Sequence, residues 1–214
     1  MRLRNIPGAR EKLEESIYVY TEEELMKGRW KKEVFKNEAP LHIEIGSGKG
    51  RFITGLAAEN PEIDYLGIEK YSSVLLKIMK KQQELDLDNL RLIRMDATYI
   101  TDAFEEGEVD RIYLNFSDPW PKDRYAKRRL TSDRFLARYE KILKKGGRVE
   151  FKTDNKDLFD FSVESVKDAG WKLGYVTHDL YSDEEMLKGN MATEYELKFT
   201  KLGNPICKLI AVYE

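Results

Sequence analysis

A glycine-rich turn and an acidic residue just before it form the first part of this sequence that could do chemistry. The turn, Gly46-Ser47-Gly48-Lys49-Gly50, follows the apolar run 41–45, and Glu44 lies two residues before its first glycine. Glycines at alternate positions let a ligand approach the backbone closely. A carboxylate at Glu44 repels a pyrophosphate and attracts a cation. Taken alone, the turn fits either a cationic ligand without phosphate, such as S-adenosylmethionine, or a tight turn that binds nothing.

Two other ligand-binding turns fit the same glycines less well. The dinucleotide fingerprint requires a third glycine three positions after the second, where this chain has Arg51. The P-loop requires a Gly-Lys-Ser/Thr ending, which is absent. A nicotinamide-linked oxidoreductase is therefore a weak alternative, and the chain also lacks a His or Tyr arrangement for hydride transfer.

Two further acids follow the next two predicted strands. Glu69 lies close to the roughly 20-residue offset at which an acid binds ribose hydroxyls in nucleotide-binding α/β folds. Asp96 could accept a hydrogen bond from an adenine amino group, with Met95 or Ala97 against the ring. Each acid alone is explained as well by a helix cap or by solvation. Together with Glu44 they favour an adenosine site.

A proline-rich segment, Asn115-Phe116-Ser117-Asp118-Pro119-Trp120-Pro121, follows the fourth predicted strand. Two prolines around a tryptophan cannot continue a helix or a central strand, so the segment is predicted to be a stiff loop. Trp120 offers a stacking surface, and Asp118 offers an acceptor for ring N–H groups of a base. A proline-rich turn with Trp120 packed in the core is the alternative, but the position at a strand end favours a base-binding loop.

A basic run comes directly after this loop. Residues 122–129 hold five basic side chains, one acid and an interleaved tyrosine. Such a run often only covers a solvated face. Because it adjoins a candidate base-binding loop, it is better explained as a contact to a nucleic-acid backbone, whose phosphates dominate affinity.

For these residues to act together, the fold must bring the ends of several strands to one edge of a sheet. Alternating apolar runs predict five βα units, and hence a mostly parallel, doubly wound α/β sheet with helices on both faces. The C-terminal part predicts an antiparallel hairpin of 193–200 and 206–213 around Gly203 and Pro205. The predicted strands are 41–45, 64–69, 90–96, 110–116, 148–153 and 171–177, and the predicted helices are 51–60, 71–86, 132–144 and 156–168.

Length and composition limit the remaining possibilities. A chain of 214 residues suits a single domain, with residues 1–38 as a polar, partly helical extension. A net charge of −2 means that an anionic partner must meet a local patch. The sequence shows no spanning helix and no signal peptide, so a cytoplasmic protein without a membrane partner is expected. Cys207, His42 and His178 lie at no ligand spacing, so no metal is expected.

With the Glu-x-Gly-x-Gly turn, the Asp-Pro-Trp-Pro-Lys loop and the basic run, the sequence resembles the bacterial tRNA (guanine-N7)-methyltransferases. The resemblance runs from Arg4-Asn5 to the C-terminal strands, and residues 115–129 are its most specific part. It implies a Rossmann-like class I methyltransferase fold, S-adenosylmethionine as cofactor, tRNA as partner, and methylation at position 46 of the tRNA variable loop. The chain has Tyr125 where the family often has His.

The resemblance also implies roles for individual residues. The cofactor site would be lined by Glu44, Gly46, Gly48, Glu69, Asp96 and Asp118. The substrate guanosine would be met by Lys122, Asp154, Thr193, Glu194, Tyr195 and Glu196. The tRNA would be contacted by Arg124, Tyr125, Ala126, Lys127, Arg128 and Arg129.

The chemistry of guanine N7 needs no general base, because this atom carries a free lone pair and no proton at neutral pH. Positive charge moves onto the purine during transfer, so Asp118 is the candidate catalytic residue. A non-catalytic RNA-binding protein of the same fold and a small-molecule methyltransferase are the alternatives, and the latter has no use for residues 122–129. A monomer and a homodimer are both compatible with the sequence.

Overall fold

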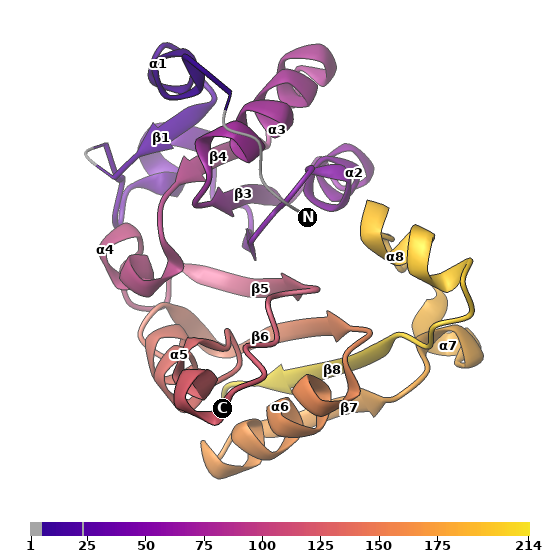
Figure 1. Cartoon of the computed structure of the whole chain (residues 1–214). Helices are drawn as coiled ribbons and strands as arrows, with labels where there is room; N and C mark the ends of the chain where they lie inside the picture. Colours follow the sequence, from indigo (N-terminus) through magenta and orange to yellow (C-terminus); the bar gives the residue numbers. More distant parts are fainter. Residues whose placement is uncertain (1–5, 23) are drawn as a thin grey trace. The chain divides into compact units, whose positions relative to one another are not determined.

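The structure is a computed structural model that describes residues 6–22 and 24–214. Arg4 and Asn5, with which the family resemblance begins, lie outside the described residues. The chain divides into two compact units, Met1–Glu105 and Glu106–Glu214, referred to below as unit 1 and unit 2. In Figure 1, unit 1 runs from indigo to magenta and unit 2 from pink to yellow. The single-domain organisation expected from the sequence stays a prediction.

Unit 1 contains a parallel sheet with the strand order β1-β4-β3-β2 (Figure 1). The predicted strands at 41–45 and 64–69 are confirmed, and the predicted strand at 90–96 is confirmed over its first five residues. The sequence did not predict β1. The strands are β1 (Val19–Thr21), β2 (Leu41–Ile45), β3 (Asp64–Glu69) and β4 (Leu90–Arg94), and the helices are α1 (Ala9–Glu14), α2 (Arg51–Glu59), α3 (Ser72–Leu85) and α4 (Ile100–Ala103).

The core of unit 1 explains why these segments fold as they do. Every residue of β2 and β3 is buried, as expected for strands covered on both faces. In α2 and α3 the side chains of Ile53, Leu75 and Ile78 are fully buried. Trp30 is also fully buried, and its indole N–H donates to the carbonyl of Ala103 at 2.8 Å. The segment before β2 is thereby tied into unit 1.

Unit 2 contains a mixed sheet with the strand order β5-β6-β8-β7 (Figure 1). Strands β5 and β6 are parallel, and β8 is antiparallel to both of its neighbours. The predicted helix 156–168 is confirmed at both ends. The strands are β5 (Val109–Asn115), β6 (Leu143–Thr153), β7 (Lys172–Thr177) and β8 (Cys207–Val212), and the helices are α5 (Asp133–Tyr139), α6 (Lys156–Asp168), α7 (Glu184–Leu187) and α8 (Glu194–Thr200).

The predicted helix 132–144 is wrong in its second half. Helix α5 ends at Tyr139, and β6 begins at Leu143 and runs through Gly146 and Gly147. The two glycines do not end a helix, because their backbone pairs with Tyr213 through hydrogen bonds of 2.7 and 2.9 Å. A Cβ at Gly147 would lie 2.7 Å from the carbonyl oxygen of Lys144, so glycine is required at this close approach.

The predicted strand 193–200 is wrong as well. This segment is α8, and it begins with a capping box in which the Thr193 hydroxyl accepts from the Glu196 N–H while the Glu196 carboxylate accepts from the Thr193 N–H. The antiparallel partner of β8 is therefore β7 on one side and β6 on the other. A mostly parallel α/β fold with antiparallel C-terminal strands is confirmed, but 193–200 is not one of these strands.

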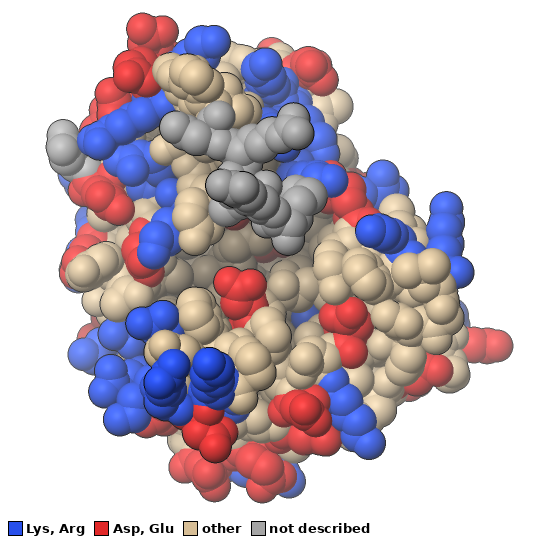
Figure 2. All heavy atoms as spheres, in the orientation of Figure 1, with Lys and Arg blue, Asp and Glu red and all other residues tan. Residues whose placement is uncertain are grey.

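Basic and acidic side chains both lie on the face of the molecule that Figure 2 presents. Figure 2 shows Lys and Arg side chains interspersed with Asp and Glu on the face that it presents. Within the part of the chain that the structure describes, no helix has the length and apolar character needed to cross a membrane.

Candidate functional site

The glycines of the first turn in unit 1 have two different functions. Gly46, Gly48 and Gly50 all have positive φ angles, of 82°, 54° and 83°. A Cβ at Gly46 would meet nothing within 4 Å, and one at Gly48 would meet only the Gly46 carbonyl oxygen at 3.8 Å. A Cβ at Gly50 would lie 2.7 Å from Ile78 of α3. The first two glycines leave open space beside the backbone, whereas the third lets the turn pack on α3.

Two of the predicted acids are held beside this turn. Glu69 is 8% exposed, and its carboxylate accepts from the backbone N–H groups of Gly48 at 3.3 Å and Tyr71 at 3.0 Å. Glu44 is buried at the end of β2, and its carbonyl accepts from the Ser47 hydroxyl at 3.2 Å. Because parallel strands end at one edge of the sheet, β2 and β3 bring Glu44 and Glu69 to the same edge, where the turn begins.

The third acid, Asp96, caps a short 3-10 helix that follows β4. Its carboxylate accepts from the Thr98 N–H at 2.9 Å and from the Lys70 ammonium at 2.6 Å. Burial by itself raises the pKa of Asp96, but the hydrogen bonds from Lys70 and Thr98 outweigh it and lower the pKa to about 2. The capping alternative is thus realised, and a contact of Asp96 with adenine stays a prediction.

Unit 1 fits a cationic nucleoside without phosphate. The space that a Cβ would fill at Gly46 and Gly48 is where a ligand can approach the backbone. Glu69 can accept hydrogen bonds from ribose hydroxyls, and Glu44 adds negative charge close to the turn. No group of three or more His, Cys, Asp or Glu side chains in the described ranges could hold a metal ion.

In unit 2, the Asp-Pro-Trp-Pro loop (residues 116–121) has strained backbone and is fixed at both ends. Phe116 and Trp120 have positive φ angles of 52° and 43°, a backbone conformation that residues other than glycine adopt at a cost of about 1–2 kcal/mol. The Phe116 N–H donates to the Lys152 carbonyl at 2.8 Å. The Arg129 guanidinium donates to the carbonyls of Pro119 and Trp120, each at 3.1 Å. Strain that persists because the surroundings hold it is typical of functional loops.

Asp118 is exposed within this loop, so its carboxylate is accessible to a substrate. Trp120 is half-buried and does not pack in the core as the alternative explanation of this loop required. Its ring lies edge-on to Tyr125, with 5.9 Å between the ring centroids. The loop therefore presents a carboxylate and a partly exposed aromatic ring.

The basic run continues from the loop as a 3-10 helix, Asp123–Arg128. The Arg128 guanidinium lies 5.0 Å from the Trp120 ring centroid and 4.7 Å from that of Tyr125. The Arg124 guanidinium lies on the same tyrosine at 4.8 Å. Cations at these distances are attracted to aromatic rings, so the four side chains form a cluster in which Arg128 contacts both rings and Arg124 contacts Tyr125.

The predicted RNA-contacting residues are not equivalent in the structure. Arg129 is half-buried, covers the Phe161 ring at 4.3 Å and holds the loop carbonyls. Ala126 is also half-buried. The ammonium groups of Lys122 and Lys127, by contrast, belong to exposed side chains. The run thus contains residues that hold the loop and residues that are accessible to phosphates.

The predicted guanosine-contacting residues lie around the start of α8. The Tyr195 hydroxyl donates to Asp154 at 3.1 Å, and its ring centroid lies 4.8 Å from that of Phe116. Asp154 does not cap α6, because Asn155 does so by accepting from the Leu158 N–H at 2.8 Å. Glu194 is the first residue of α8 and is half-buried. The half-buried Asp154 and the exposed Tyr195 therefore form a pair beside the start of the Asp-Pro-Trp-Pro loop.

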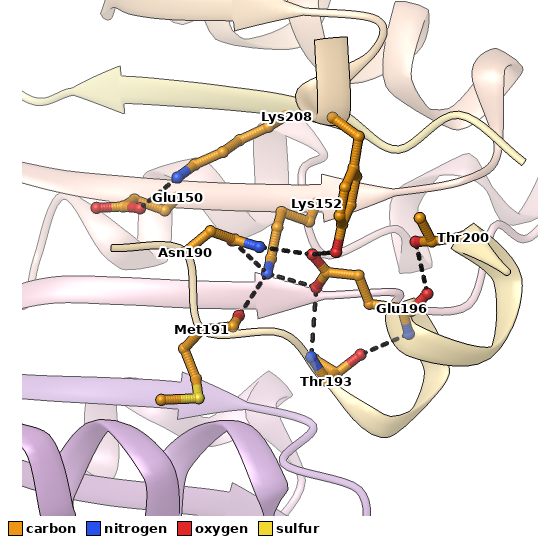
Figure 3. A network of polar contacts seen from close by, with 9 residues as sticks. Glu150, Lys152, Asn190, Met191, Thr193, Glu196, Thr200 and Lys208 are labelled. Carbon is orange, nitrogen blue, oxygen red and sulfur yellow. Dashed lines mark hydrogen bonds and ion pairs between the residues drawn. The ribbon is translucent and has the colours of Figure 1, made fainter. Parts of the chain in front are cut away.

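Glu196 differs from its neighbours because its side chain has no exposed surface. It forms an ion pair with Lys152 at 2.6 Å in the polar network of Figure 3. Lys152, Asn190 and Tyr181 also belong to this network, and no functional motif in the sequence includes them. The sequence signal for this arrangement is the Thr-x-x-Glu spacing of the capping box, which competes with the strand-like alternation of residues 193–200.

Known proteins resemble this chain over most of its length. The family described as "Putative methyltransferase" matches residues 38–209. A tRNA (guanine-N(7)-)-methyltransferase of Lachnoclostridium phytofermentans is 59% identical and covers 100% of this chain and 99% of that protein. The proteins of the same name from Listeria monocytogenes and Bacillus subtilis are 49% and 47% identical, and cover 100% and 96% of this chain and 99% and 96% of those proteins.

Solved structures share the fold at low sequence identity. The 16S rRNA methyltransferase KamB matches with a TM-score of 0.67 and 13% identity, over 89% of this chain and 95% of that one. An antibiotic-related methyltransferase matches with a TM-score of 0.63 and 20% identity, over 85% of this chain and 90% of that one. These matches confirm the Rossmann-like class I methyltransferase fold.

Proposed function

This chain belongs to the tRNA (guanine-N7)-methyltransferase family, and from that premise we propose that it methylates the guanine at position 46 in the variable loop of tRNA. The enzyme uses S-adenosylmethionine, as the family does. The observation that carries the proposal for the acceptor site is the Asp-Pro-Trp-Pro loop, which is held at both ends and continues into the cluster of arginines and aromatic rings.

The methyl donor would be held by unit 1. Its adenosine and amino acid parts would lie along the open backbone of Gly46 and Gly48, with Glu69 accepting from the ribose hydroxyls. Glu69 also accepts from the Gly48 N–H, so ligand binding and turn geometry depend on the same carboxylate. When bound, this cofactor supplies an electrophilic methyl group on a sulfonium centre.

Asp118 would stabilise the charge that develops on the base. Guanine N7 carries a free lone pair, so no side chain has to remove a proton before methyl transfer. The purine becomes cationic, and a carboxylate beside it favours the product-like state over the neutral base. Because the loop is fixed before substrate arrives, Asp118 needs little rearrangement to act.

The basic run would bind the tRNA backbone. Lys122, Arg124 and Lys127 are exposed, and each can neutralise a phosphate. The half-buried rings of Trp120 and Tyr125 offer faces or edges for an unstacked base. Tyr125 keeps this aromatic function where the family often has His. The substrate contacts proposed for Lys122, Asp154 and Tyr195 lie at the same loop or at the start of α8.

One assay tests donor, acceptor and atom together. Labelled methyl transfer from S-adenosylmethionine to unmodified tRNA transcripts is followed by borohydride and aniline treatment, which cuts the chain at N7-methylguanosine. A single cut at position 46 is expected. Label without a cut would contradict N7 as the acceptor atom, and a cut elsewhere would contradict the position. Cytoplasmic location and a monomeric or homodimeric state complete the proposal and are checked by fractionation and light scattering.

A further inference from the structure

Lys152 is a buried lysine at the end of β6 that the family resemblance left without a role. Only 4% of its side chain is exposed. Its ammonium donates to Glu196 at 2.6 Å, to the Asn190 side-chain oxygen at 3.1 Å and to the Met191 carbonyl at 2.9 Å (Figure 3). An ammonium group has three N–H donors, so these three acceptors use all of them. Lys152 is thus held in one geometry.

The Glu196 carboxylate is occupied to the same degree. One oxygen accepts from the Tyr181 hydroxyl at 3.1 Å and from the Asn190 side-chain amide at 2.8 Å. The other accepts from Lys152 and from the Thr193 N–H at 3.3 Å. Four donors fill the usual sites of a carboxylate, and the side chain is fully buried. Glu196 cannot also contact a guanosine unless this network breaks.

Lys152 connects two parts of the acceptor region in unit 2. Its carbonyl accepts from the Phe116 N–H at 2.8 Å, where the Asp-Pro-Trp-Pro loop begins. Its side chain fixes Glu196 and hence the start of α8, where Tyr195 donates to Asp154. The rings of Phe116 and Tyr195 lie in contact, with centroids 4.8 Å apart. The backbone of Lys152 therefore holds the start of the Asp-Pro-Trp-Pro loop, and its side chain holds the start of α8.

We propose that Lys152 and Glu196 are positioning residues that set the geometry between the Asp-Pro-Trp-Pro loop and the Asp154–Tyr195 pair, and that Glu196 acts through Lys152 and not on the guanosine. This inference rests on the proposed function, since it assigns a role within the acceptor region. It changes the role that the family resemblance implies for Glu196. Thr193 acts in the same way, as the cap of α8.

The test compares single and double variants. Lys152→Met leaves a buried carboxylate without its cation, and we expect a clear loss of thermal stability and a fall in kcat of about 10- to 100-fold at saturating tRNA. Lys152→Met combined with Glu196→Gln leaves no buried charge and keeps the side-chain volumes, so we expect recovery of stability and of most of kcat. Affinity for S-adenosylmethionine should stay unchanged in all variants, because unit 1 binds it.

Lys208→Met is the matched control. Lys208 is buried and lies opposite Lys152, on the neighbouring strand β8. Its ammonium pairs with Glu150 at 3.4 Å. Without Lys208, Glu150 still has Arg148 as a partner at 2.9 Å. We expect a loss of stability without a fall in kcat at temperatures where the protein is folded. An equal fall in kcat would show that any buried lysine of this sheet has the same effect, and would overturn the inference.

The double variant decides between positioning and direct contact. If Glu196 contacts the guanosine, Glu196→Gln alone lowers kcat, and the double variant has the same low kcat instead of recovering most of the wild-type value. That result would overturn the inference even if Lys152→Met does not fold, because it needs only the Glu196→Gln and double variants. The wild-type protein in the same assay tests the proposed function separately, because absence of N7-methylguanosine there would contradict that function. The effect of the Lys152–Glu196 pair on thermal stability would still be measured in that case.

Discussion

The two units of the molecule build their candidate sites in different ways. In unit 1 the site consists of a turn and two acidic residues at the ends of neighbouring strands, and backbone N–H groups hold the Glu69 carboxylate. In unit 2 it consists of a strained loop, a cluster of rings and guanidinium groups, and a helix start fixed by a buried ion pair. We infer that unit 1 is sensitive mainly at positions that face the ligand. Unit 2 should also be sensitive at buried positions that face no ligand.

The largest effect is expected at Asp118. We expect Asp118→Ala to lower kcat by about 10²- to 10³-fold, the range for removal of one preorganised electrostatic contact, with little change in the Kd of S-adenosylmethionine. Asp118→Asn keeps the shape of the side chain but not its charge, so this variant should still show part of the loss in kcat. Single-turnover methyl transfer and calorimetric titration measure the two quantities. Equal losses in S-adenosylmethionine binding and in turnover would contradict this difference between the two units, because Asp118 would then be a cofactor ligand, as the family resemblance implies.

The second effect separates two glycines of one turn. Gly46→Ala places a methyl group in open space beside the backbone, so we expect about a tenfold weaker binding of S-adenosylmethionine and a loss of about 1–2 kcal/mol from the positive φ angle. Gly50→Ala has the same backbone strain and adds a contact of 2.7 Å with Ile78, so its stability loss should be larger. Calorimetry measures both. If the two substitutions weaken cofactor binding and stability alike, Gly46 has no ligand-facing function.

The third effect divides the basic run. Lys127→Ala should raise the KM for tRNA several-fold and reduce the slope of log K against log salt by about 1, since one phosphate contact is lost. Arg129→Lys should leave that slope unchanged and lower kcat, because a lysine cannot make both hydrogen bonds to the loop carbonyls with one planar group. Tyr125→His provides a matched control that retains an aromatic ring. A reduced slope for Arg129→Lys would place that side chain on the tRNA.

The smallest effect concerns the Lys70–Asp96 pair of unit 1. The pKa of Asp96 in the folded protein is lowered from the ordinary value of 3.8 to about 2, so the Asp96 carboxylate binds a proton more readily in the unfolded chain. The stabilisation is therefore present above pH 3.8 and is lost as the pH falls towards 2. Lys70→Met should reduce this dependence, by less than about 1 kcal/mol because the lysine is more than half exposed. Unfolding by urea at pH 5 and pH 2.5 measures it, and an unchanged difference would exclude the pair as the cause.

Unit 1 was largely predictable because its signals are local. The strand 41–45, the glycine turn and the acid at Glu69 follow one another in the sequence, and parallel strands bring their ends together by rule. The Lys70 partner of Asp96 was not predicted, because the two residues lie on neighbouring strand ends and their pairing depends on side-chain reach. The open space beside Gly46 was not predictable from the turn, because Gly50 has nearly the same positive φ angle and packs on Ile78 instead.

Unit 2 was predictable at the Asp-Pro-Trp-Pro loop and the basic run, where proline and charge act locally. Its remainder depends on contacts between distant residues. The run 193–200 alternates enough to resemble a strand, and the Thr-x-x-Glu spacing that indicates a helix start is confirmed only by the hydrogen bonds of Thr193 and Glu196. The pairing of Lys152 with Glu196 joins residues 44 positions apart, which no periodicity encodes. The glycines at 146 and 147 resemble a helix end and instead allow a strand to approach its neighbour.

The strand order of unit 2 has a consequence for synthesis on the ribosome. Strand β8 follows β7 in the sequence but lies between β6 and β7 in the sheet. A nascent chain that has released β6 and β7 therefore exposes two strand edges that wait for a common neighbour, and such edges invite pairing with other chains. Translation speed through residues 178–206 sets how long this interval lasts. A pause in that stretch should increase aggregation of newly made protein, although the folded enzyme would be identical.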